Sequence, residues 1–418
     1  MPGIRVVPEI VPSECSVTAD IEGGIGKAMD AIITALTAPL TVPEKSPPLP
    51  PSTPPGVVFK GTLEEVNQFF YRRGWTDGLP VIPPTEAAVA EMLGGTDLPA
   101  DYVVGDLPPM KGHATIKKIA INAVMAGCLP TYMPLLIAGV ECMLTTGAGT
   151  RSDPNSGYGL ATSSAGSWGF LWIVNGPVRD QIHVNYATGA LGPGNIANQA
   201  IGRALYLITK NIGGSREGVE CMASLGSPWR KGLVVGEREA ESPWESLSVQ
   251  AGFNKEDSTI SLTIPNSLIQ ASPYGTDAKG ILQGIMSNVA PTGFTATIMI
   301  TVDNANQLAR SGFTKQKLMD YLAQNTAVPA REHPTYYSAS PAPNSRTKEI
   351  IAGLPKDPNT PMKVLSGERL NVFVAGGPTM FGIFEGGRNV VTRKARLPAN
   401  WDRLVKKYDN MVPVYVKY

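Results

Sequence analysis

The sequence of 418 residues has few cysteines and histidines and no concentration of charge of either sign. Its four cysteines and three histidines form no C-x-x-C and no H-x-x-H pair, so we expect no zinc or other metal site. The formal net charge is +1 with Lys and Arg scattered, which gives no electrostatic reason to expect a nucleic-acid partner. Sparse cysteines without regular spacing are typical of a reducing compartment, and we expect a cytoplasmic protein.

Long apolar runs are also missing. The longest, residues 119–144, is interrupted by polar residues and two prolines, so the sequence predicts no membrane-spanning helix. The first residues lack the apolar core of a secretory signal. There is no Walker loop, no G-x-S-x-G and no H-E-x-x-H motif, so no motif identifies a cofactor or a reaction.

Proline and glycine, in contrast, are abundant. Residues 41–56, TVPEKSPPLPPSTPPG, hold seven prolines and predict an extended, semi-rigid linker. This linker separates an N-terminal arm, residues 1–40, from a main body, residues 57–418. Apolar residues at helical spacing predict a helix over 24–36 in the arm. Because so short a piece cannot bury its own apolar face, we expect it to pack on another subunit of a homo-oligomer.

The main body alternates between strand and helix patterns. Helices are predicted at 62–73, 85–93, 195–211, 278–287, 305–311, 315–324 and 401–408, with others opening near residues 113, 130 and 242. Strands are predicted at 170–174, 181–186, 231–236, 259–263, 295–302, 371–375 and 414–418. The pattern favours an α/β (or α+β) fold with a mixed sheet flanked by helices, a helical N-terminal third and a proline-linked arm. Two subdomains are expected to divide near residues 250–270.

Two glycine-rich turns are candidate ligand sites. GALGPGNI at 189–196 follows a predicted strand and precedes a helix, where backbone N–H groups and the helix dipole can bind an anion. Gly192, Gly194 and Asn195 are its candidate binding residues, although a tight packing turn fits the same pattern. The dinucleotide fingerprint is a poor match, because a proline separates the glycines. VFVAGGP at 372–378 places Gly376 and Gly377 after a strand, where open α/β sheets bind ligands, although a simple turn fits this pattern equally well.

Polar loops and isolated reactive residues complete the candidates. Arg151, Asn155 and Asn185 are expected to bind substrate, and Asp153 and His183 to move a proton, unless these loops are simply solvated. Cys128 stands at a helix end before Leu129-Pro130, where a thiol could be exposed and reactive, although a lone cysteine is more often buried. Lys117 is a further candidate for proton transfer.

The segment GWTDGLPVIPPT, residues 74–85, is stiffer than an ordinary loop. Its prolines fix φ and its glycines permit backbone geometries that are closed to other residues. Trp75 is expected to anchor the loop, which leaves Asp77 as its one ionisable group. Asp77 is therefore a candidate catalytic residue, or else it caps its own turn.

Several strings together resemble a bacterial family of unassigned activity. They are GWTDGLPVIPPT, ATIKKIAINAVMAGC (114–128), IVNGP (173–177), GALGPGNIANQAIGRAL (189–205), ESPWESL (241–247) and VAGGP (374–378). The resemblance covers nearly all of residues 60–418.

Members of this family accompany, or are fused to, small UGSC-motif proteins whose first motif residue is Cys or selenocysteine. The resemblance therefore implies a redox partner of this type and gives no reaction for the chain itself. The arm resembles the tail of such a small domain, but the Cys-Gly-Ser-Cys core is absent.

Two functions remain open from the sequence. The first is an enzyme acting on a small anionic molecule by redox or carbon–heteroatom lyase chemistry, with a UGSC-type partner as a further participant. The second is a binding or scaffold subunit, without catalysis of its own, that completes a partner's active site.

Overall fold

The computed structural model describes residue 7 and residues 18–46, 56–145, 157–289, 295–333, 355–365, 370–387 and 390–412. The chain forms two compact units, Met1–Lys60 and Gly61–Tyr418, whose boundary lies close to the predicted start of the main body. In the described part of the chain, no helix combines the length and apolar composition needed to cross a bilayer.

The first unit is helical where it is described. α1 (Thr18–Thr37) contains the predicted helix 24–36, which is confirmed. Met29, Ile33 and Leu36 are exposed on it. α2 (Val42–Lys45) forms a helical turn where an extended linker was predicted, so that prediction is wrong at its beginning. The proline-rich residues 47–55 lie outside the described part.

The second unit opens with the predicted helical region. It contains α3 (Leu63–Arg72), α4 (Glu86–Leu93), α5 (Ile116–Ala126), η1 (Pro130–Tyr132), α6 (Met133–Thr145), α7 (Gly157–Ser163) and the hairpin β1 (Val103–Leu107) and β2 (Gly112–Thr115). Threonine caps start three of the helices, because the side chains of Thr62, Thr85 and Thr115 accept hydrogen bonds from first-turn N–H groups. Gly127 ends α5 with φ +83°, a conformation that favours glycine.

The first sheet has the strand order β12-β5-β3-β4. Its strands are β3 (Leu171–Asn175), β4 (Leu233–Gly236), β5 (Thr259–Thr263) and β12 (Val391–Lys394), and the connecting helices are α8 (Val178–Gln181), α9 (Ile196–Asn211), η2 (Pro228–Lys231) and α10 (Leu247–Gln250). β3 pairs parallel with β4 and antiparallel with β5, which in turn pairs antiparallel with β12. The long helix α9 is the crossover between the two parallel strands.

The second sheet has the strand order β10-β7-β11-β6. Its strands are β6 (Ser267–Ala271), β7 (Thr295–Ile300), β10 (Leu370–Val374) and β11 (Phe381–Gly387), with helices α11 (Ala278–Asn288), α12 (Val302–Arg310) and α13 (Lys315–Asn325). A small hairpin, β8 (Ala327–Pro329) and β9 (Pro361–Lys363), η3 (Ala330–Glu332), α16 (Trp401–Tyr408) and η5 (Asp409–Met411) complete the described elements.

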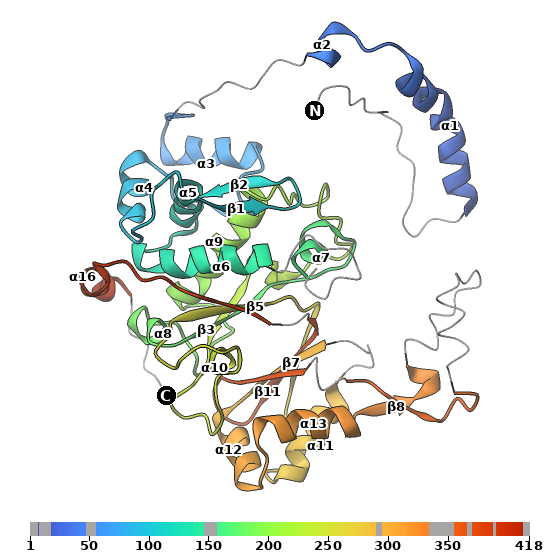
Figure 1. Ribbon diagram of the computed structural model, residues 1–418, viewed down its shortest axis with the longest axis vertical. Helices are drawn as coiled ribbons and strands as arrows, with labels where there is room; N and C mark the ends of the chain where they lie inside the picture. The colour runs from blue at the N-terminus through green and yellow to red at the C-terminus, as the bar shows by residue number, and fades with distance from the viewer. Residues whose placement is uncertain are drawn as a thin grey trace. The chain divides into compact units, whose positions relative to one another are not determined.

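The two sheets pack face to face and each carries helices on its outer face. Leu171, Ile173 and Val235 of the first sheet share a buried cluster with Met299, Phe373 and Phe384 of the second. The alternate residues of β3, Trp172 and Val174, face the core under α5, α6 and α9. Ile298 and Val372 face the core under α11–α13. The result is a helix–sheet–sheet–helix arrangement, in which the layers follow one another from α6 and α9 to α11 and α13 (Figure 1).

The two sheets repeat one topology. In both, two parallel neighbours are joined through helices, the third strand is antiparallel to them, and the fourth is antiparallel to the third. The two sheets differ in where the fourth strand lies in the sequence. β6 precedes its sheet partners in the chain, whereas β12 follows all strands of the second sheet.

The predicted fold class, with helices flanking mixed sheets, is confirmed. The chain passes from the first sheet to the second between β5 and β6, within the single compact unit Gly61–Tyr418. A strand at 181–186 was predicted wrongly, since α8 ends there and His183 has φ +58°. Ser242 starts no helix; its hydroxyl pairs with the backbone of Trp244, and α10 begins after Ser246. The predicted strand 414–418 lies outside the described residues.

Candidate functional site

One strand of each parallel pair ends at a glycine turn. β3 ends at Asn175, directly before Gly176-Pro177, and β10 is followed by Ala375 and the turn Gly376-Gly377-Pro378. Gly176 and Gly376 have φ +79° and +89°, in the region that glycine adopts most readily. Loops diverge beyond the carboxyl ends of parallel strands, so ligands of α/β sheets commonly bind there.

A pocket of about 450 Å³ lies where β7 and β10 end, and residues of both sheets line it. We call it the intersheet pocket. Its backbone rim includes Gly192, Gly376 and Gly377, three residues that the sequence predicts to bind a ligand. The structure therefore brings the two predicted glycine turns, which are far apart in the chain, to the same pocket.

The two turns fit closely against each other. Gly376 N donates a hydrogen bond of 2.8 Å to Tyr186 O. A Cβ on Gly377 would lie 2.5 Å from Thr188 Oγ1, which is closer than real Cβ contacts. Gly377 is therefore required for the contact between the turns, and the turns form a fixed rim.

A glycine inside β11 creates the space of the pocket. In the sheet register Gly382 lies between Gln270 of β6 and Met299 of β7, and all three residues line the pocket. A Cβ on Gly382 would meet its nearest neighbour, Leu268, at 3.5 Å, which is ordinary contact. Glycine within a strand often marks the close approach of a ligand. Here the missing side chain leaves a hollow between the sheets.

The walls of the intersheet pocket are mostly apolar. The main wall residues are Leu191, Trp229, Leu233, Leu268, Met299 and Phe381. Gln270 and Thr301 contribute polar side chains, and Trp229 adds an indole N–H that is buried without a hydrogen-bond partner among the described residues. Among the described residues that line it, none has an ionisable side chain. The pocket thus suits an uncharged molecule and contributes no acid, base or thiol of its own.

The predicted anion site at residues 189–196 gains no support from the geometry. Gly192 N donates to Gly189 O at 2.8 Å, so it is used within the turn. Asn195 Oδ1 accepts from Asn198 N at 3.0 Å and caps α9, while its Nδ2 donates to His183 O at 3.0 Å. Gly194, with φ +109°, is not part of the pocket lining. The turn positions α9 and one rim of the pocket.

Asn185 likewise serves its own loop. Its Oδ1 accepts from Ala187 N at 2.9 Å and its Nδ2 donates to Thr188 O at 3.1 Å. The loop is also held by Asn198, whose amide bonds the backbone of Asn185, Ala190 and Val234. The side-chain amide of Asn185 therefore stabilises the loop that leads into the glycine turn at the pocket rim.

Asp77 is held by Arg203 of α9 rather than presented to a pocket. Arg203 Nε and Nη2 donate to the two carboxylate oxygens at 3.0 and 2.9 Å, and Lys231 Nζ lies 3.8 Å away. Burial alone would raise the pKa of Asp77, but Arg203 outweighs it and the pKa lies below its ordinary value. Arg203 also donates to Pro80 O at 2.7 Å. The segment 74–85 is thus fastened to α9, which is a structural role.

Cys128 is buried, so the expectation that a helix end exposes its thiol is wrong. It is 8% exposed, and its Sγ donates to Ala200 O at 3.3 Å. Burial also raises the pKa of the thiol, which disfavours the reactive thiolate. Lys117 is exposed on the first turn of α5 and does not line the intersheet pocket. Arg151, Asp153 and Asn155 lie outside the described residues.

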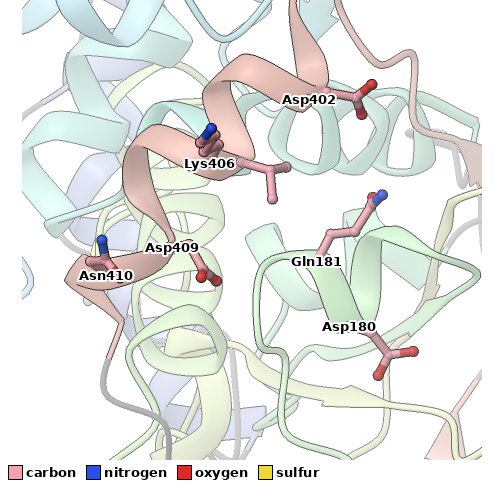
Figure 2. Close-up of a pocket in the computed structure, with 7 residues that line it drawn as sticks. Asp180, Gln181, Asp402, Lys406, Asp409 and Asn410 are labelled. Carbon is pink, nitrogen blue, oxygen red and sulfur yellow. The ribbon is translucent and has the colours of Figure 1, made fainter.

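His183 lies at a different place, beside a groove between α8 and α16. Its Nε2 lies 2.7 Å from Asp409 Oδ1. Asp409 lines a groove of about 380 Å³ together with Asp180, Gln181, Asp402, Lys406 and Asn410 (Figure 2). The Gln181 side chain points toward α16, where Trp401 Nε1 donates to it at 2.9 Å. A His–Asp pair can transfer protons, so the role of His183 stays a prediction for this separate groove.

A buried charged network follows β4, and the sequence interpretation missed it. Glu237 Oε2 accepts hydrogen bonds of 2.8 Å from Asn175 Nδ2 and from Leu247 N. Lys315 Nζ of α13 lies 3.9 Å from Glu237 Oε1 and donates to Glu245 O at 2.9 Å. Burial raises the pKa of Glu237 and lowers that of Lys315. The sequence feature that could have indicated this network is the charged run Glu237-Arg238-Glu239, which directly follows a predicted buried strand.

Arg179 extends this network to a second pocket, of about 730 Å³, beyond β3. Its Nη1 donates to Glu239 Oε2 at 2.8 Å and its Nη2 to Asp180 Oδ2 at 2.7 Å. Its guanidinium lies over the Tyr186 ring, 4.5 Å from the centroid. Since Tyr186 also bonds Gly376, the charged network supports the rim of the intersheet pocket from behind.

The described residues contain no group of three or more His, Cys, Asp or Glu side chains that could hold a metal ion. Comparison with protein-family models, curated proteins and solved structures gives no match for this chain. What the chain can bind therefore follows from the geometry of its pockets.

Proposed function

We propose that the chain binds a small, uncharged, largely apolar molecule in the intersheet pocket. The observation that carries this proposal is the lining: two glycine turns and apolar side chains around a hollow of about 450 Å³, without an ionisable group among the described lining residues. Pockets for small molecules are commonly of this size and composition. An anionic ligand, which the sequence suggested, would find no positively charged side chain among the described residues that line this pocket.

The same lining favours a binding subunit over an enzyme that works alone. General acid–base and nucleophilic catalysis need an ionisable or nucleophilic side chain within hydrogen-bond reach of the substrate. The described lining offers a threonine hydroxyl, a glutamine amide and a tryptophan indole N–H, none of which is an acid, a base or a thiol. We therefore propose that the reactive group comes from a partner, for which the family resemblance implies a Cys- or selenocysteine-bearing protein.

Binding can be tested with N-phenyl-1-naphthylamine, an uncharged dye whose fluorescence increases in apolar surroundings. The full chain should bind one equivalent of the dye. Gly382→Leu fills the hollow from a strand position where a Cβ fits, and should weaken binding at least about tenfold, or ~1.4 kcal/mol. Gly23→Leu adds the same side chain in α1, where a Cβ meets no atom within 4 Å, and should leave dye binding unchanged. Equal binding by wild type and Gly382→Leu would overturn the proposed site.

The partner hypothesis needs a separate experiment. Purified chain should show no turnover in a broad substrate screen, and addition of a small Cys- or selenocysteine-bearing partner should restore it. Turnover by the chain alone, retained in Gly382→Leu, would favour an independent enzyme with a site elsewhere.

A further inference from the structure

The intersheet pocket has one deeply buried hydroxyl group, on Thr301, where β7 ends and α12 begins. Thr301 lines the pocket and is 3% exposed. Its Oγ1 accepts a hydrogen bond of 3.0 Å from Asn304 Nδ2. Because an amide nitrogen can only donate, the hydroxyl hydrogen of Thr301 is left to be donated to another acceptor. The described part of the chain shows no protein acceptor for it.

The start of α12 adds a second donor surface at the same point. Thr301 is the N-cap residue of this nine-residue helix, and no side chain caps its first-turn N–H groups. Such groups carry partial positive charge and favour an oxygen acceptor nearby. Thr301 therefore places a buried hydroxyl hydrogen and a helix N-terminus together beside the pocket, whose described lining is mostly apolar.

A negative charge close to Thr301 favours a neutral hydrogen-bond acceptor over an anion. Asp303 is the second residue of α12, and its Oδ2 accepts a hydrogen bond of 3.0 Å from Thr379 N. Thr379 lies between Pro378 and Met380, which both line the pocket. The Asp303 carboxylate would repel an anion at the helix N-terminus, whereas a neutral carbonyl oxygen meets no such opposition.

We propose that the ligand of the intersheet pocket carries a neutral carbonyl group that accepts a hydrogen bond from the Thr301 hydroxyl. Its apolar remainder packs between Leu233, Leu268 and Met299. This inference rests on the proposed function and specifies its ligand class as an uncharged ketone or amide. Thr301 is then the residue that determines specificity, because it can distinguish a carbonyl compound from a hydrocarbon of the same shape.

Two fluorescent dyes of matched shape test this. The ketone probe is 6-propionyl-2-(dimethylamino)naphthalene, and the reference probe is 6-propyl-2-(dimethylamino)naphthalene, in which a methylene group replaces the carbonyl. Thr301→Val keeps the branched shape and removes the hydroxyl. It should weaken binding of the ketone about three- to tenfold, as expected for one neutral hydrogen bond, and leave the reference unchanged. The emission of the bound ketone should also shift to shorter wavelength, because the bond to its carbonyl is lost.

Matched variants separate this effect from local damage. Thr301→Ser retains the hydroxyl and should restore affinity for the ketone. Asn304→Ala removes the neighbouring amide but not the hydroxyl, and should bind both dyes as wild type does. Circular dichroism and melting curves establish that each variant is folded.

The outcomes distinguish the hydrogen bond from Thr301 to a carbonyl group from the binding of any ligand in the intersheet pocket. Equal weakening of both dyes in Thr301→Val would show that Thr301 acts by shape alone, which overturns the inference and leaves the pocket in place. An unchanged affinity for the ketone overturns it as well. If neither dye binds wild type, the proposed function fails and the inference fails with it.

Discussion

Asp77 illustrates how a single residue can suggest chemistry in the sequence and serve structure in the fold. The sequence placed it correctly in a loop between two helices, but its partner Arg203 lies 126 residues further along the chain. A contact of that kind has no local signal, so the ion pair could not be predicted. The same holds for Cys128, because helix ends are exposed or buried according to what packs on them.

Asp77→Asn should lower the free energy of unfolding by about 2–3 kcal/mol, because Arg203 loses its bidentate partner in a largely buried place. The folded pKa of Asp77 is depressed, so its stabilisation is present above the unfolded pKa, about 3.9, and is lost as pH falls through the folded value. The difference in urea unfolding between wild type and variant should therefore be full at pH 7 and begin to shrink as the pH falls below about 4.

Asp101→Asn is the control for that measurement. Asp101 is exposed, and its substitution should change stability by less than about 0.5 kcal/mol. A difference between wild type and Asp77→Asn that is the same at pH 3 and pH 7 would contradict the ion-pair account.

At the scale of elements, helices with caps and doubly buried strands could be predicted from the sequence. The bounds of β5 and α16 agree with the predictions residue by residue, and those of α9, α11 and α13 agree within about one residue. β6, β11 and β12 were not predicted, because they depend on pairing with distant strands more than on their own pattern. For the same reason, only the glycine turns of the pocket could be predicted, because they have a local sequence signature. Its other lining residues Gln270, Met299 and Gly382 become neighbours only when the sheet forms.

The contact between α9 and the turn before β4 requires glycine on both sides. A Cβ on Gly202 would lie 2.1 Å from Gly232 O, and this neighbour is backbone that cannot rotate away. Gly202→Val should therefore separate the helix from the sheet and lower the melting temperature by more than 5 °C. A melting temperature within 2 °C of wild type, by calorimetry, would show that the two backbones can separate without loss.

At the scale of the whole second unit, the buried pair Lys315–Glu237 joins the two halves. Glu237 follows a strand of the first sheet, and Lys315 begins a helix that covers the second. Lys315→Met should cost about 3–5 kcal/mol, because it leaves a buried carboxylate without its cation. Burial raises the folded pKa of Glu237, so its stabilisation is present at low pH and is lost as pH rises through that pKa.

The deficit of Lys315→Met should consequently be largest at neutral pH and shrink toward pH 4. The double variant Lys315→Met with Glu237→Gln removes both charges and should recover part of the stability. A deficit that is independent of pH, and not relieved in the double variant, would mean that lost packing rather than charge is responsible.

The arm leads to a prediction about assembly. Because α1 leaves Met29, Ile33 and Leu36 exposed, we still expect it to pack on another copy of the chain. Deletion of residues 1–56 should then lower the solution mass measured by light scattering, or cause aggregation. An unchanged mass with full solubility would show that the arm does not mediate assembly.

The late position of β12 in the chain has a consequence for biosynthesis. β5 gains its second neighbour only when residues 391–394 have left the ribosome, after the complete second sheet has been made. Until then a translating ribosome carries a first sheet with an open edge at β5, which is a template for pairing with other nascent chains. Slow translation or premature termination between β11 and β12 should therefore lead to aggregates, and chaperones that cover strand edges should be needed most during this interval.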